Sequence, residues 1–241
     1  MSQLSVHGPL VVRIVARLFP LRQTLPPGKS LEELKRTYLK WERINALEFI
    51  LLAIAAVYAV HAALVWYGAK QVRSDPAAVF VLRPGPEFWY FPASLLGCVI
   101  AGVLVRLLNR AMLPEGGREF RCYSNVNAGL NVSGMFGAIA VVAVAFGALL
   151  SYFAASNEVL LRQNDMMIHR LWSFNDETHS YTDITAIRNI HNPQENHDDF
   201  EIDFANDEPW TTHVEVVFFT AQEMDFLARR SGKPIQQLVA Q

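Results

Sequence analysis

Three long apolar runs divide the chain, and a segment of alternating apolar and polar residues follows them. Each run is about 20 residues long, which is the helical length that crosses the hydrocarbon core of a bilayer. The pattern therefore predicts three transmembrane helices at about residues 49–67, 88–108 and 135–155. The segments on either side of this membrane part are more polar.

The period of the pattern changes from helical to alternating at Glu158. Alternation is typical of strands with one buried face. It predicts strands at 159–161, 166–172 and 181–190, and a hairpin of 200–204 with 210–218. A helix is expected from about Ala221 to Arg230, with Thr220 as its cap and Gly232 as its end.

These patterns together predict the fold class. The chain is expected to be an α-helical membrane protein with three transmembrane helices, followed by a small β-rich α+β domain. The expected divisions are an N-terminal region at 1–44, a transmembrane domain at 45–156 and a soluble domain at 157–241.

The N-terminal region is expected to contact lipid. Ser30 and Glu33 have the spacing of a capping box, and a basic amphipathic helix should run from there into the first span. The segment 8–20 is too short to span, so it either lies in the membrane interface or packs on the protein's own helices. The basic residues expected to meet anionic headgroups of the inner leaflet are Arg13, Arg17, Lys35, Arg36, Lys40 and Arg43.

Charge is distributed unevenly along the chain. Residues 1–44 carry eight Lys and Arg against three acids, and residues 157–241 carry six against fifteen. Lys and Arg near the ends of spans favour the cytoplasmic side. Twelve basic residues on the side of the N-terminus against five on the other predict a cytoplasmic N-terminus and a C-terminal domain across the membrane. If one run only dips into the bilayer, or if residues 8–20 re-enter it deeply, that domain is cytoplasmic instead.

Three segments of the C-terminal part, followed by the expected helix, resemble small bacterial domains with a pleckstrin homology (PH) fold. They are Met166 to Trp172, Tyr181 to Ile187 and Phe200 to Trp210. The membrane half resembles multi-span bacterial proteins. The resemblance implies a PH-like binding or assembly module in a bacterial inner membrane. The acidic tail departs from the basic pocket of lipid-binding members, which favours a protein partner or a neighbouring copy.

Two places carry side chains that could do chemistry. His61 lies inside the first run, where an ionisable residue indicates proton relay, metal binding or cofactor ligation, or else a structural bond between helices. The other place is a polar loop with four candidate metal ligands, His191, His197, Asp198 and Asp199, whose spacing matches no established site. A solvated loop is the alternative there.

No motif for catalysis, for a cofactor or for nucleic-acid binding is present in the sequence. We therefore expect a membrane protein that is not an enzyme and that presents a protein-binding domain as an anchor, assembly factor or accessory subunit. One alternative is a transporter or channel component that uses His61 and the small-residue faces of its helices. A second is a metal-dependent enzyme that uses the loop from His191 to Asp199.

Overall fold

The structure is a computed structural model that describes residues 10–21, 24–71, 75–113, 116–171, 173–192, 197–205, 209–212, 217 and 219–239. The chain divides into two compact units. The first comprises Met1–Val60 and Pro92–Gly147, and the second comprises His61–Phe91 and Ala148–Gln241.

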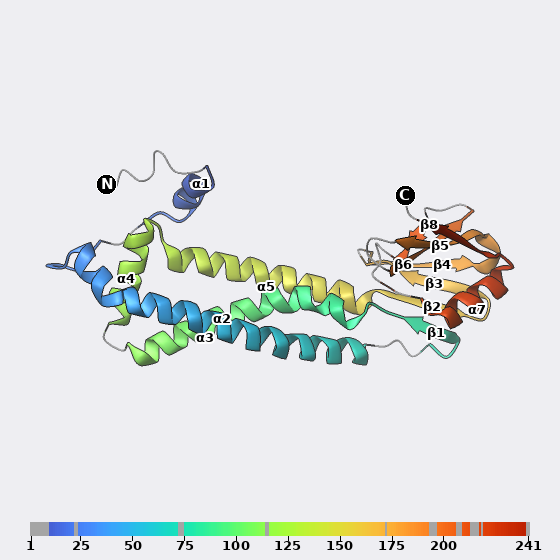
Figure 1. The fold of residues 1–241 in the computed structure, drawn as a ribbon, viewed down its shortest axis with the longest axis horizontal. Coiled ribbons are helices and arrows are strands. Elements are labelled where there is room, and N and C mark those ends of the chain that lie inside the picture. The colour runs from blue at the N-terminus through green and yellow to red at the C-terminus, as the bar shows by residue number, and fades with distance from the viewer. Residues whose placement is uncertain are drawn as a thin grey trace. The chain divides into compact units, whose positions relative to one another are not determined.

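Among the described residues, three helices are long and apolar enough to cross a membrane, which confirms the three predicted spans by length and composition (Figure 1). They are α2 (Leu31–Lys70), α3 (Tyr90–Met112), which a short 3-10 helix η2 (Pro86–Trp89) precedes, and α5 (Val132–Ser156). The amphipathic segment and the first span form the single helix α2, as expected. The Ser30 amide donates to the Glu33 carboxylate and the Glu33 amide donates to Ser30 Oγ, each over 3.2 Å, so the capping box is also confirmed.

The first unit also contains two shorter helices. They are α1 (Leu10–Leu18) and α4 (Gly117–Ala128), the second of which lies in a segment that the sequence analysis left without structure. Leu34 and Tyr38 of α2 are buried in a cluster with Phe120 and Tyr123 of α4. The apolar face of the amphipathic part of α2 is therefore covered by protein, while its basic residues remain exposed.

The contact between α2 and α3 depends on a glycine. A Cβ atom added at Gly97 would lie 2.7 Å from Val57 Cγ2 and 2.8 Å from the Val57 backbone nitrogen. The small residues buried in α3 are Ala93, Gly97 and Ala101. These three small residues are spaced four apart and form one face of α3, whereas a Cβ atom added at Gly102 would meet nothing within 4 Å.

In the second unit the described strands form two four-stranded sheets. In the first sheet the strands follow the order β1 (Ala78–Leu82), β2 (Glu158–Arg162), β3 (Asp165–His169) and β4 (Asp176–Ser180), all antiparallel. The second sheet has the order β7 (Trp210–Thr211), β6 (His197–Phe204), β5 (Ile184–Asn192) and β8 (Ile235–Val239). A 3-10 turn, η3 (Tyr181–Asp183), connects the sheets, and β8 pairs with β5 in parallel.

Strand β1 comes from the connection between the first and second spans, which falls within the expected transmembrane domain at 45–156. Its Phe80 pairs with Leu161, and its Leu82 pairs with Val159. The β-rich domain therefore includes Ala78–Leu82 in addition to strands from the predicted range 157–241. The alternating pattern does not predict strands β4 and β8 either, because β4 is polar and β8 follows the helix expected from about Ala221 to Arg230.

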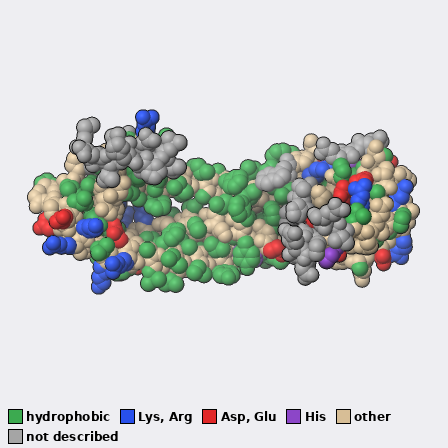
Figure 2. Space-filling model, turned by 45° about the horizontal axis from the view of Figure 1, so that its top comes forward, with side chains coloured by type: hydrophobic (Ala, Val, Ile, Leu, Met, Phe, Trp, Pro, Cys, Tyr) green, Lys and Arg blue, Asp and Glu red, His purple; other side chains and the backbone are tan. Residues whose placement is uncertain are grey.

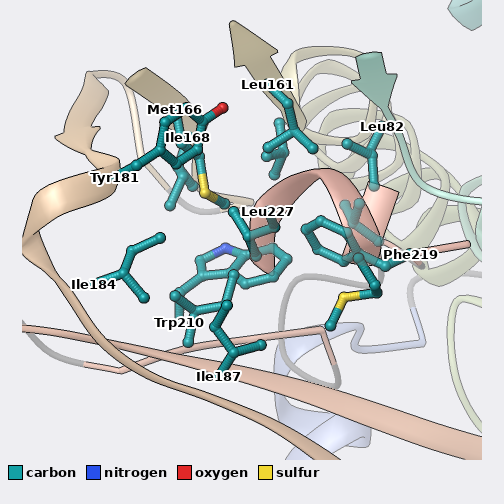
Figure 3. Close-up of a cluster of buried hydrophobic side chains, with 14 of the residues drawn as sticks. Leu82, Leu161, Met166, Ile168, Tyr181, Ile184, Ile187, Trp210, Phe219 and Leu227 are labelled. Carbon is teal, nitrogen blue, oxygen red and sulfur yellow. The ribbon is translucent and has the colours of Figure 1, made fainter. Parts of the chain in front are cut away.

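The helix α7 (Ala221–Ser231) and both sheets contribute to one hydrophobic core (Figure 3). Trp210, Ile187 and Leu227 are each fully buried in it. The predicted limits of α7 are confirmed, since Thr220 and Glu223 form a capping box and Gly232 ends the helix with a φ of +68°. Leu82 belongs to this core as well, so the inter-span strand contributes to the packing of the domain.

Candidate functional site

A row of charged and polar side chains lies across neighbouring strands of the first sheet. It stands at the end of the sheet where β2 follows α5. We call it the polar row, and it consists of Arg83, Glu158, His169 and Asp176. In strand register Glu158 lies opposite His169, and His169 lies opposite Asp176. Arg83 directly follows β1. Residues in register across neighbouring strands share one face of a sheet, so β2, β3 and β4 hold these three side chains on the same face.

The four members of the polar row form two pairs, each with a short polar contact. Arg83 Nη2 lies 2.6 Å from Glu158 Oε2, and His169 Nδ1 lies 2.7 Å from Asp176 Oδ1. The Glu158 side chain is 1% exposed and that of His169 is 5% exposed. Removal of one partner from a buried ion pair leaves an uncompensated charge, which is strongly destabilising. The Arg83 guanidinium is therefore needed to keep Glu158 in place.

Arg83 also binds the end of the first span. Its Nη1 donates to the carbonyl of Gly68 over 2.7 Å, and its Nη2 donates to the carbonyl of Gln71 over 2.9 Å. The last carbonyls of a helix lack partners within the helix and attract cations. One guanidinium thus connects the end of α2 to Glu158, which stands two residues after the end of α5.

The same helix end is held by a close aromatic contact. A Cβ atom added at Gly68 would lie 2.6 Å from the ring of Trp89. Trp89 is the last residue of η2 and directly precedes α3. Trp89 is 5% exposed. The end of α2, the start of α3 and the end of α5 therefore all lie next to the inter-span connection that supplies β1.

A second ion pair fixes this connection at its other end. Asp75 accepts the Ala77 amide over 2.9 Å and pairs with Arg162 of β2 at 2.7 Å. The hydrogen bond from the Ala77 amide, and next the one from the Arg162 guanidinium, lower the pKa of Asp75 below its ordinary value. Tyr181 donates to the Arg162 carbonyl over 2.8 Å, and burial raises the pKa of this phenol above its ordinary value. Ion pairs therefore tie both ends of the β1 segment to β2.

His61 lies in the part of α2 that belongs to the second unit. Its Nε2 is 2.8 Å from the carbonyl oxygen of Pro86, and its ring stacks on Tyr90 with centroids 3.8 Å apart. A carbonyl oxygen can only accept, so Nε2 is the donor. The contact joins the first span to the start of the second. It is a bond of the kind expected if His61 has a structural role between helices.

Among the described side chains of the candidate metal ligands, the structure brings two together. His191 Nδ1 and Asp198 Oδ1 are 2.7 Å apart, and the two residues face each other across β5 and β6. Asp199 is the next residue on β6, so its side chain points to the opposite face. The His197 side chain lies outside the described part of the chain. Among the described residues no group of three or more His, Cys, Asp or Glu could hold a metal.

The candidate headgroup ligands lie on the first unit. Arg17, Lys35, Arg36, Lys40 and Arg43 are exposed, and the side chain of Arg13 is not among those described. Figure 2 shows Lys and Arg side chains near the beginning of α2, next to a wide hydrophobic surface. Exposed apolar side chains on α5 include Val141 at 70% and Phe136 at 61%.

Comparison with known proteins gives no relative for this chain, since no family model, no curated protein and no solved structure matches it. The interpretation of the site therefore depends on its geometry. The sequence does not predict the polar row, because Arg83 and Glu158 are 75 residues apart and Arg83 enters the sequence argument only as a charge beside a span. The one local signal was Glu158, an isolated acid directly after a long apolar run.

Proposed function

We propose that this chain is a non-enzymatic integral membrane protein that presents a PH-like domain to a protein partner, as an anchor, assembly factor or accessory subunit. The observation that carries the proposal is the attachment of the β-rich domain. Strand β1 from the inter-span connection is part of its sheet, and Arg83 bonds both Glu158 and the end of α2. Such an attachment suits a domain that is held at the membrane.

The order of the strands supports the PH-like assignment. Strands β1 to β4 form one antiparallel meander, β5 to β7 form a second, and α7 packs on the core that both share. Two departures from this pattern are specific to the chain. The first strand precedes two transmembrane helices, and β8 adds a parallel strand to the second sheet.

The charge of the domain favours a protein as its partner. Residues 157–241 carry fifteen acids against six Lys and Arg. An acidic surface is repelled by the anionic headgroups of a cytoplasmic leaflet. We place the N-terminus and its basic helix on the cytoplasmic side of a bacterial inner membrane and the β-rich domain on the opposite side, in agreement with the distribution of Lys and Arg.

Photo-crosslinking tests the proposal. A photoreactive residue is placed at Thr178 on β4 or at Gln237 on β8, because both are exposed and lie on strands at the edges of the sheets. The matched control is Val141 on the apolar face of α5. We expect a discrete protein adduct from an edge strand and none from Val141. If neither edge gives an adduct and the detergent-purified protein has the mass of a monomer, the proposal is wrong.

A further inference from the structure

The loop between β3 and β4 carries an aromatic ring that the core of the domain does not use. Phe174 is 70% exposed, whereas its loop neighbour Leu171 is 5% exposed. Large apolar side chains at such exposure are costly in water, so clusters of them indicate a partner. The position of Phe174 indicates what that partner is.

Phe174 packs on the last part of the third span. Its ring centroid is 5.3 Å from that of Phe153 and 6.2 Å from that of Tyr152. Tyr152 precedes the end of α5 at Ser156 by four residues, or about 6 Å along the helix axis. A residue from the β-rich domain is therefore at the same level as residues inside a span.

Hydrogen bonds fix the shape of this loop. The Ser173 amide donates to the Arg170 carbonyl over 3.0 Å, and the Asn175 amide donates to Ser173 Oγ over 3.0 Å. Arg170 and Glu177 form an ion pair at 2.8 Å on the strand side of the loop. The charge of Arg170, four residues before Phe174, is thus paired with a carboxylate.

Other exposed aromatic residues stand at the same ends of the three spans. Those of the second unit, with their exposed fractions, are Trp66 at 61%, Tyr67 at 44%, Tyr90 at 43%, Phe91 at 59% and Tyr152 at 51%. Aromatic side chains gather where a bilayer meets water. Phe174 continues this aromatic belt, although it comes from the β-rich domain and not from a helix.

We propose that the β3–β4 loop inserts Phe174 into the interfacial layer of the bilayer, beside the end of α5. The β-rich domain then has a direct lipid contact in addition to its three covalent connections to the spans. The partner is the apolar boundary below the headgroups. The acidic character of the domain disfavours anionic headgroups and does not oppose insertion of a neutral ring.

Depth-dependent fluorescence quenching tests the insertion. In a Cys98→Ser and Cys122→Ala background, Phe174→Cys is labelled with an environment-sensitive fluorophore and the full chain is reconstituted in phosphatidylcholine vesicles. Lipids with a nitroxide near the headgroup serve as quenchers. Tyr152→Cys is the matched control for lipid contact, and Gln237→Cys is the control for a site in water.

We expect quenching at residue 174 close to that at 152 and severalfold above that at 237, with a melting temperature equal to that of the unsubstituted background. Quenching at 174 no greater than at 237 would overturn the proposal. The same conclusion would follow from a blue-shifted emission at 174 without quenching by lipid, because that result assigns the ring to a second copy of the protein.

Discussion

The Arg83 guanidinium lies 2.6 Å from the Glu158 carboxylate, although 75 residues and two transmembrane helices separate the two in sequence. The same guanidinium binds the carbonyls that end α2. The pair therefore joins the β-rich domain to the first span at the place where the third span ends. It is the structural basis for interpreting the domain as part of a membrane assembly and not as a mobile appendix.

Substitution of one partner of this pair should destabilise the protein strongly. Arg83→Met leaves the Glu158 carboxylate buried without its counter-charge, and such losses cost about 3 kcal/mol or more. The measurement is thermal or chemical unfolding in detergent. Lys29→Met is the control, because Lys29 forms its ion pair with Glu119 at an exposed side chain and should cost less than about 1 kcal/mol.

A double substitution separates the charge of the pair from its packing. Arg83→Met with Glu158→Met removes both charges, and apolar replacements of a whole buried pair are often neutral. We expect the double variant to recover part of the stability lost in Arg83→Met. Equal stability of Arg83→Met and Lys29→Met would show that the buried pair has no special role.

The contact between α2 and α3 gives a sharp comparison of two glycines in one helix. Gly97→Ala adds a methyl group 2.7 Å from Val57 Cγ2, and the backbone of Val57 is as close, so the helices must separate. Overpacking of this kind costs about 1–3 kcal/mol. Gly102→Ala meets nothing within 4 Å and should be neutral or stabilising. Detergent melting curves for both variants check the prediction, and equal effects would contradict the packing of Gly97.

We predict that ionisation of the Tyr181 phenol destabilises the protein at alkaline pH. Burial, and next the nearby charge of Asp165, raise the pKa of this phenol above its ordinary value of about 10. The folded state therefore favours the neutral phenol, and this contribution is complete below about pH 10 and is lost as the pH rises further. Tyr181→Phe should lower the free energy of unfolding by about 1 kcal/mol at pH 7, because it removes the hydrogen bond to the Arg162 carbonyl. Its melting temperature should fall less steeply above pH 10 than that of the unsubstituted protein, and parallel curves would contradict this explanation.

Labelling of single cysteines tests the number of crossings. Val79 of β1 and Gln237 of β8 belong to one unit, so both should react with a membrane-impermeant thiol reagent from the same side. Arg36 near the start of α2 should react from the other side. Labelling of all three positions from one side would show that the chain does not cross the membrane three times.

The sequence predicted those elements that depend on local pattern. The three apolar helices, the capping boxes at Ser30 and Thr220, and the end of α7 at Gly232 all follow from residues within one or two turns. The segments that were missed depend on contacts with residues outside the segments themselves. Strand β4 is polar and is ordered by pairing with β3, and α4 is held by its contact with Leu34 and Tyr38.

The candidate site could be predicted even less well, for the same reason. His61 was identified because it is a polar residue in an apolar run, and its bond to Pro86 depends on the return of the chain 25 residues later. His191 and Asp198 were identified by their residue type, and the strand pairing then brought these two together while Asp199 faced away. Arg83 gave no local signal, because its role follows from the register between β1 and β2.

The pairing of β1 with β2 is the central claim, and a disulfide tests it most directly. Val81 and Leu160 lie opposite each other in register, and Cβ atoms of such pairs are close enough for a bond. Val81→Cys with Leu160→Cys is made without Cys98 and Cys122, and with a protease site between α3 and α4. The control pair is Val81→Cys with Thr178→Cys, because β1 and β4 lie at opposite edges of the sheet. We predict that, after oxidation and cleavage, the two fragments stay linked on a non-reducing gel only for the first pair. Separation of the fragments for both pairs would contradict the fold proposed for the β-rich domain and its attachment to the membrane helices.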